Sequence, residues 1–318
     1  LALDLTYMRA IRTHFHTLGR NPTDLELESI AQTWSEHCKH TIFADPLDDD
    51  VPRGLFTTYI KAATDIIRER LGKDDFCISV FKDNAGGIAF NNRFIISHKI
   101  ETHNAPSALD GYGGAITGIV GVERDEDGFG LGALPLINLY GYCFASPHLH
   151  TIFYRDRERT QQLPSPRQTM DGVVEGVKVG SNCTGIPTHP GFLVFDERYG
   201  RPLVFVGTVG FMPKESAGRK AHEKQARPGD YIVMVGGRVG KDGIHGATFS
   251  SEALDEGSPA TAVQIGDPIT QKKFTDALIK EARDLGLYTS ITDNGAGGLS
   301  CSVAEMARES GGCFIQLD

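Results

Sequence analysis

Two short stretches of this sequence carry side chains that could act together on a phosphorylated ligand. The first, WSEHC, places His37 next to a thiol at the end of a predicted helix. The second, HKIETHNAPSA at 98–108, carries Lys99, Glu101 and His103 at every other position, so an extended backbone would direct all three to one side. An ammonium group, a carboxylate and an imidazole on one strand edge are typical of sites that handle phosphates through a metal ion.

Each of these residues also has an ordinary structural explanation. A histidine at a helix end, such as His37, can simply interact with the helix dipole and the last carbonyl groups. Polar residues alternate on any half-solvated strand, so Lys99, Glu101 and His103 could equally form an exposed strand edge. The residues alone leave both alternatives open.

Two further segments combine glycine with charged side chains. GYGGAITGIVGVERD at 111–125 places five glycines before Arg124 and Asp125, and glycine lets the backbone approach a bulky anion closely. A plain turn is the alternative for this run. Asp293 lies in TDNGAGG, where a loop aspartate that caps the next helix is the alternative.

Composition bounds the class of protein. The chain has 318 residues, enough for two ordinary domains, with 40% apolar and 23% charged residues, as in soluble globular proteins. The net charge of −9 argues against a nucleic-acid surface, which needs basic patches. No apolar run approaches the ~18 residues of a membrane span, and the first residues lack a signal-peptide pattern.

The six cysteines are scattered and form no CxxC pair. This usage favours reduced thiols in a cytoplasmic protein over a disulfide framework. Cys38 and His40 beside His37 raise the question of zinc. Their spacing is too tight for a four-ligand finger and no second pair follows, so we do not expect a zinc site.

The order of elements predicts an α/β or α+β architecture with mixed sheets flanked by helices. A capping box at Glu26 begins a helix over 22–38, whose apolar stripe is Leu27, Ile30, Ala31 and Trp34. A second helix over 54–71 ends at Gly72 and turns five residues inward: Leu55, Tyr59, Ala63, Ile66 and Ile67. Later helices are expected over 166–180, 267–286 and 300–310. Strands are expected at 76–81, 93–100, 116–123, 203–211, 231–237, 287–292 and after 310.

The polar, charged segment 213–230 is the candidate domain boundary. It separates a first domain with its N-terminal helical segment, at 1–215, from a second domain at 228–318. We expect the second domain to be truncated, because the chain starts with Leu1 and stops in the apolar stretch GGCFIQLD.

The motifs, in this order, resemble phosphoribosylformylglycinamidine synthase, and the likeness extends along nearly the whole chain. The resemblance implies a two-domain unit like aminoimidazole ribonucleotide synthetase, and this chain would be the N-terminal half of the synthase. It also implies roles for individual residues. ATP would contact Lys99 and His40; Mg²⁺ would be bound by Glu101, Asp125 and Asp293; substrate would contact Thr102, His103, Asn104, Ala105, Arg124 and Gln264; and His37 with His103 would be catalytic.

Two positions depart from the family pattern. Ala105 stands where relatives often carry a second histidine, so that side chain's role is lost. His40 stands where many relatives have a tyrosine that contacts nucleotide. The segments 128–150 and 188–192 also differ from the expected pattern, so details of the substrate loops are expected to differ.

The resemblance implies ATP-dependent conversion of formylglycinamide ribonucleotide to the amidine, in purine biosynthesis. Ammonia would come from a glutaminase subunit or domain, and a second synthetase half would complete the site. An isolated chain would then form a homodimer and turn over little. The alternatives are another ATP-dependent synthetase of the same superfamily, or a non-catalytic nucleotide-binding half that supports a partner.

Overall fold

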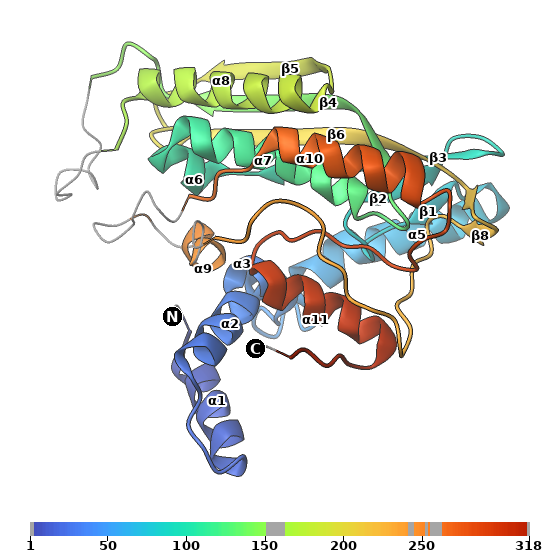
Figure 1. The fold of residues 1–318 in the computed structure, drawn as a ribbon. Coiled ribbons are helices and arrows are strands. Elements are labelled where there is room, and N and C mark those ends of the chain that lie inside the picture. The colour runs from blue at the N-terminus through green and yellow to red at the C-terminus, as the bar shows by residue number, and fades with distance from the viewer. Residues whose placement is uncertain (1–2, 151–162, 241–244, 252–253, 255–262, 317–318) are drawn as a thin grey trace.

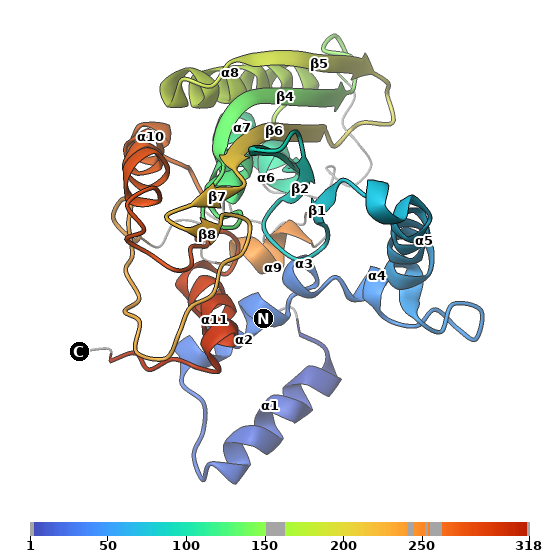
Figure 2. The ribbon, with the colours of Figure 1, turned by 90° about the vertical axis from the view of Figure 1, so that its right-hand side faces the viewer.

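A six-stranded mixed sheet forms the centre of the molecule (Figures 1 and 2). The computed structural model describes residues 3–150, 163–240, 245–251, 254 and 263–316. The strand order is β1-β2-β3-β6-β4-β5, and a separate two-stranded sheet pairs β7 with β8. The strands are β1 (Cys77–Ser79), β2 (Gly86–Ala89), β3 (Phe94–Thr102), β4 (Leu134–Phe144), β5 (Thr188–Phe195), β6 (Leu203–Pro213), β7 (Glu215–Ser216) and β8 (Arg219–Lys220).

The two faces of the sheet have different environments. β3 and β6 pair antiparallel over their whole length, with Glu101 opposite Val206 and Lys99 opposite Thr208. Along β6 the even-numbered side chains are buried and most odd-numbered ones are half-buried. Because side chains alternate across a strand, one face is packed and the other is open. Lys99 and Glu101 lie on the packed side.

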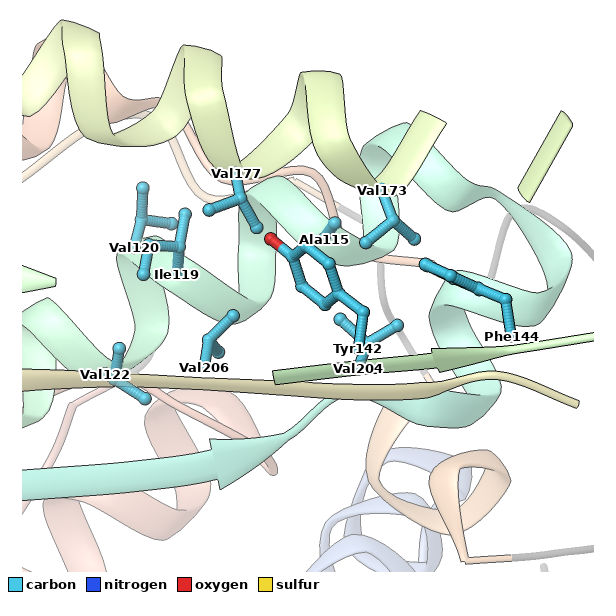
Figure 3. Close-up of a cluster of buried hydrophobic side chains, with 10 residues drawn as sticks. All are labelled: Ala115, Ile119, Val120, Val122, Tyr142, Phe144, Val173, Val177, Val204 and Val206. Atoms are coloured by element: carbon cyan, nitrogen blue, oxygen red, sulfur yellow. The ribbon is translucent and has the colours of Figure 1, made fainter. Parts of the chain in front are cut away.

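Three helices cover the packed face. They are α6 (Asn104–Leu109), α7 (Gly111–Asp127) and α8 (Pro166–Thr184), and α8 lies over α7 and β4 (Figure 1). The main core lies between this helical layer and the sheet. Figure 3 shows its side chains: Ala115, Ile119, Val120, Val122, Tyr142, Phe144, Val173, Val177, Val204 and Val206.

The segment 116–123, predicted as a strand, is instead the middle of α7. Asp110 caps this helix by accepting a hydrogen bond from the Gly113 amide at 3.0 Å. A Cβ at Gly176 of α8 would lie 2.5 Å from the Tyr112 carbonyl oxygen. Close helix packing therefore requires the glycines, and tertiary burial overrides the strand preference of the β-branched residues.

The remaining helices lie outside this layer, except α10, which packs against α7 and α8 (Figure 1). They are α1 (Leu5–Thr17), α2 (Asp24–Trp34), α3 (Glu36–Lys39), α4 (Thr41–Ala44), η1 (Phe56–Lys61), α5 (Ala62–Leu71), η2 (Gly72–Asp74), α9 (Gly246–Ser250), α10 (Pro268–Ala277), η5 (Leu278–Ala282) and α11 (Gly298–Ser310). The capping box of Thr23 and Glu26 is confirmed. The single helix predicted over 22–38 is wrong, because Ser35 is extended and separates α2 from α3.

The helix expected over 54–71 forms, as η1 followed by α5 with Gly72 at its end, but its predicted inward face is not buried. Tyr59, Ile66 and Ile67 are 63%, 50% and 56% exposed. Leu55 is half-buried and Ala63 is exposed. The apolar stripe identifies the face that favours burial, but it does not supply an element to cover that face.

Three predicted strands of the second half are absent from the described residues. Segment 231–237 is irregular, as are 287–292 and the described residues after 312. Tyr231 is 94% exposed and Phe314 is 87% exposed. A strand is stabilised by a neighbour that takes up its backbone hydrogen bonds, and these segments have no ladder partner among the described residues. The overall fold, a mixed α/β sheet flanked by helices, is as predicted.

The described helices include none that is both long and apolar enough to cross a membrane.

The sheet-facing side of α7 buries two carboxyl groups. Glu123 accepts hydrogen bonds from the amides of Asn138, at 2.7 Å, and Gln271, at 3.2 Å. Glu126 accepts a hydrogen bond from the Ser97 hydroxyl, and its second carboxyl oxygen has no partner among the described residues. Burial raises the pKa of both carboxyl groups to about 8.

The raised pKa values predict that stability falls as pH increases. In the unfolded chain these carboxyls lose their protons near pH 4.5, whereas in the folded protein they keep them to about pH 8. Their contribution to the free energy of unfolding is fully present below pH 4.5, and it is lost as the pH rises to about 8. In Glu126→Gln, the fall of the unfolding free energy with pH should become less steep, by up to about 1.4 kcal/mol per pH unit.

Urea unfolding at several pH values between 5 and 8 would measure this slope. The control is Glu175→Gln on the exposed side of α8, which should leave the slope unchanged. An identical slope in Glu126→Gln and the parent protein would contradict a protonated Glu126.

Candidate active site

The end of β3 brings a lysine between two carboxylates. The Lys99 ammonium lies 2.8 Å from a Glu101 carboxyl oxygen and 3.4 Å from a carboxyl oxygen of Asp125. Asp125 comes from the last turns of α7, which runs antiparallel to β3 across the packed face. Burial alone would lower the pKa of Lys99, but Asp125 and Glu101 outweigh it and raise that pKa.

Asn84 and Arg124 join this group to Asp293. The Asn84 amide donates to Asp125 at 3.2 Å and to Asp293 at 2.9 Å. The Arg124 guanidinium donates to the other Asp293 carboxyl oxygen at 3.0 Å. Residues far apart in the sequence, from the loop before β2, from α7 and from the loop before α11, therefore meet at one place.

The carboxylates of this cluster repel one another. Burial raises the pKa of Asp125 to about 7, and the negative charges of Asp293 and Glu101 act in the same direction. The Lys99 ammonium and the Arg124 guanidinium oppose this rise. A site with this electrostatic imbalance favours an additional cation.

Two histidines lie beside Glu101. His37 is in α3, and burial lowers its pKa while the Glu101 charge partly opposes the change. His103 directly follows β3; burial lowers its pKa to about 4, and its Nδ1 has no hydrogen-bond partner among the described residues. An imidazole with a lowered pKa is neutral at pH 7 and can accept a proton.

The predicted substrate residues after His103 differ in their surroundings. Thr102 is exposed, and Ala105 is half-buried in α6. The Asn104 carboxamide oxygen accepts a hydrogen bond from the Val204 amide at 2.8 Å, so it anchors α6 to β6. His40 is exposed and adopts a left-handed backbone conformation at the end of α3.

The structure brings Gln264 to α7 rather than to the carboxylates. Its backbone carbonyl accepts a hydrogen bond from the Thr117 hydroxyl, which also accepts from the Gly266 amide at 2.9 Å. Thr117 precedes Arg124 by seven residues, about two helical turns or ~10 Å. The Gln264 side chain is exposed at that distance from the carboxylate cluster.

Sequence reasoning missed Asn84 and Lys224. The only signal for Asn84 is its place in NAGG at 84–87, between two predicted strands, where it precedes two glycines. The Lys224 ammonium lies 2.6 Å from Asp83 and donates to the carbonyls of Gly128, at 2.7 Å, and Ile291, at 3.0 Å. It joins the loops that carry Asn84, the end of α7 and Asp293.

The donor set suits Mg²⁺ in its chemistry, because Glu101, Asp125 and Asp293 offer hard carboxylate oxygens. Their mutual repulsion is the observation that supports this fit, since a divalent ion would relieve it. In the structure Lys99 and Asn84 lie between the carboxylates. Within the described residues, no three acidic, histidine or cysteine side chains are grouped as a ready metal site.

The arrangement combines features needed for phosphoryl chemistry. It has one ammonium and one guanidinium that can neutralise phosphate oxygens, three carboxylates that can hold a metal ion, and two neutral imidazoles. Lys99 and Glu101 come from the end of β3, and α3, α7 and the loops before β2 and α11 bring the other side chains to them. The site therefore suits binding of a polyphosphate next to a group that gains or loses a proton.

Family models match three parts of the chain. Residues 82–212 match the AIR synthase related protein, N-terminal domain, and residues 227–318 match the C-terminal domain. Residues 1–40 match the formylglycinamide ribonucleotide amidotransferase linker domain.

Curated relatives match along the whole chain. Phosphoribosylformylglycinamidine synthase subunit PurL of Thermoplasma acidophilum is 36% identical over 326 aligned residues, which cover 100% of this chain and 38% of that relative. The subunit of the same name from Methanopyrus kandleri is 35% identical over 95% of this chain and 36% of its own length. The chain thus spans about two fifths of the length of the curated relatives it matches.

Solved structures of the same subunit share the fold. T. maritima PurL complexed with FGAR superimposes with a TM-score of 0.67 at 27% identity, covering 96% of this chain and 42% of that chain. T. maritima PurL complexed with ATP gives a TM-score of 0.63 at 26% identity, covering 96% of this chain and 40% of that chain.

The electrostatics of the cluster give opposite predictions for two variants. Asp293→Asn removes a negative charge, so it should lower the Asp125 pKa from about 7. Lys99→Gln removes the opposing ammonium, so it should raise that pKa further. A titration of the carboxyl carbon shift of Asp125 by NMR, in metal-free protein, would measure both. A shift of the same sign in the two variants would refute the described geometry.

Proposed function

Because the chain belongs to the phosphoribosylformylglycinamidine synthase family, we propose that it contributes to the ATP-dependent conversion of formylglycinamide ribonucleotide to formylglycinamidine ribonucleotide, in purine biosynthesis. The observation that carries the proposal is the convergence of Lys99, Glu101, Asp125 and Asp293 beside His37. Solved relatives at 26–27% identity are complexed with FGAR and with ATP.

In the proposed reaction, the γ-phosphoryl group of ATP is transferred to the formamide oxygen of the substrate. Ammonia then attacks the activated carbon and inorganic phosphate leaves. Lys99 would face the nucleotide phosphates, and the exposed His40 would border the nucleotide. A positively charged lysine suits this position because negative charge spreads over the phosphoryl oxygens during transfer.

Glu101, Asp125 and Asp293 would hold Mg²⁺ in this site. A bound Mg²⁺ supplies charge neutralisation for the phosphate oxygens. Lys99 lies between Glu101 and Asp125, and Asn84 lies between Asp125 and Asp293. Arg124 would turn its planar donor fork to the ribose phosphate of the substrate.

We propose the remaining substrate contacts for residues at the end of β3 and for Gln264. Thr102, His103, Asn104 and Ala105 line the end of β3, and Gln264 approaches from the segment held by Thr117. His37 would take a proton from the attacking nitrogen, because its lowered pKa keeps the imidazole neutral at pH 7. His103, which is also close to Glu101, would be a second proton acceptor.

Ammonia requires a partner in this proposal. We propose a glutaminase subunit or domain as its source, and a structure named PurLQS from Thermotoga maritima, at 26% identity, matches 94% of this chain and 39% of its own length. Six free thiols support the predicted cytoplasmic location.

A second synthetase-type unit would complete the site. The open face of the sheet supports this proposal, because Ile88 and Ile100 are each 39% exposed and Ile96 is half-buried between them. A hollow of about 600 Å³ lies over these residues. The division of the chain into domains at 1–215 and 228–318 belongs to the same proposal.

The proposed role of His37 can be tested in an enzyme that contains this chain together with the rest of the synthetase. His37→Ala should lower kcat by about 10²-fold or more, because it removes a proton acceptor. ATP binding should remain nearly unchanged. Product formation would be followed with ATP, formylglycinamide ribonucleotide and ammonium chloride.

The matched control is His14→Ala, in the last turn of α1, a helix that lies apart from the central sheet (Figure 2). It should retain the parent kcat. Turnover of His37→Ala within a few-fold of the parent would remove His37 from the catalytic residues. Activity on aminoimidazole precursors but not on formylglycinamide ribonucleotide would favour another synthetase of the superfamily.

The open face predicts that the isolated 318-residue chain self-associates. A two-fold homodimer would cover this face in place of the second unit, and it should show little phosphate release. Ile88→Glu places a charge on the open face and should shift the chain toward monomer in sedimentation velocity. Val174→Glu, on the outer side of α8 where Val174 is 46% exposed, is the control and should not. A monomeric parent chain with full synthase activity would contradict both the shared site and the interface.

A further inference from the structure

Two cysteine thiols from distant parts of the chain meet next to the proposed site. Cys38 belongs to α3, and Cys301 lies in the first turn of α11. Their side chains are hydrogen-bonded to each other. Both residues are half-buried, so a small solute can reach them.

The surrounding backbone holds the second thiol in place. A Cβ atom at Gly297 would lie 2.5 Å from the Cys301 sulfur, so this thiol packs directly on the glycine loop that leads into α11. The same position would lie 3.8 Å from the Gln32 Cβ of α2, which shows that α2 and α11 are in contact. The start of α11 is therefore held against α2, which is in turn packed against α3, the helix that carries Cys38.

The hydrogen bond makes the two thiols unequal. By accepting it, Cys38 has its pKa lowered to about 7, whereas the pKa of Cys301, the donor, is raised. At neutral pH a larger fraction of Cys38 is therefore thiolate than in an ordinary cysteine. A thiolate is the form that attacks an oxidant, and a neighbouring thiol can then resolve the product.

We propose that Cys38 and Cys301 are a redox-sensitive pair that a peroxide converts to an intramolecular disulfide. In the first step, the Cys38 thiolate attacks one oxygen of hydrogen peroxide, the O–O bond breaks, and hydroxide leaves, which forms a sulfenic acid. In the second step, Cys301 loses its proton and attacks the sulfenic sulfur; the S–O bond breaks and water leaves. The two thiols lose two electrons, and one peroxide becomes two waters.

The disulfide would join two elements that border the proposed site. Cys38 follows His37 in α3, and Cys301 follows the loop that begins at Asp293. The disulfide would therefore fix the distance between α3 and the start of α11. Any effect on catalysis rests on the proposed function, whereas formation of the disulfide does not.

The test uses the full 318-residue chain, reduced and then treated with hydrogen peroxide at pH 7. After remaining thiols are blocked with N-ethylmaleimide, peptide mass spectrometry should find the peptides of Cys38 and Cys301 joined, and dithiothreitol should separate them. Before oxidation, iodoacetamide should alkylate Cys38 on the order of tenfold faster than Cys77. Cys77 is the matched control, because it is also half-buried but burial raises its pKa.

Two variants keep the proposal open to refutation. In Cys301→Ser, peroxide should leave a sulfenic acid on Cys38 that dimedone traps, and the joined peptide should be absent. Cys183→Ser should form the joined peptide as the parent does. Cys38 and Cys301 that both remain reduced in peroxide, or that form only disulfides between chains, would overturn the proposal even where the enzyme assay supports the proposed function.

Discussion

The packing of α7 on the sheet is the constraint on which the site depends. Its middle is buried against β4 and β6, and Gly118 approaches His103 so closely that a Cβ there would lie 3.0 Å from the histidine Cβ. The end of the same helix carries Arg124 and Asp125 to the end of β3. Because one rigid helix spans both regions, a change in its packing would move His103 and the charged cluster together.

Other segments attach to α7 through polar contacts. Thr117 holds the segment of Gln264, and Gln271 of α10 donates to the Val120 carbonyl at 2.9 Å. Thr275 of α10 donates to Asp127 at 2.5 Å. The described part of the second half therefore docks on α7 by hydrogen bonds to a buried helix rather than by a separate large core. This explains why its extended apolar segments can remain exposed while its helices are in place.

The charged cluster combines attractive and repulsive interactions between its side chains. Three carboxylates lie near one ammonium and one guanidinium, and burial strengthens both attraction and repulsion. Asn84 bridges Asp125 and Asp293 with a neutral donor, which fixes their positions without neutralising them. This arrangement suits the Mg²⁺ ion and the phosphate groups of the proposed function. In the neighbouring thiol pair, a single hydrogen bond changes two pKa values: it lowers the pKa of Cys38 and raises that of Cys301.

The sequence by itself determined the local features that depend on neighbouring residues. Capping at Thr23, the helix end at Gly72 and the side alternation of Lys99 and Glu101 follow from short-range geometry, and the structure contains all three. Only the tertiary structure decided that 116–123 is a helix, because the glycines of α7 and α8 permit a close contact that no local preference encodes. It also decided that Asn84 joins Asp125 to Asp293, since this contact depends on where distant loops meet. Local patterns specify which face of an element favours burial, whereas its partner is set by packing between elements that are far apart in the chain.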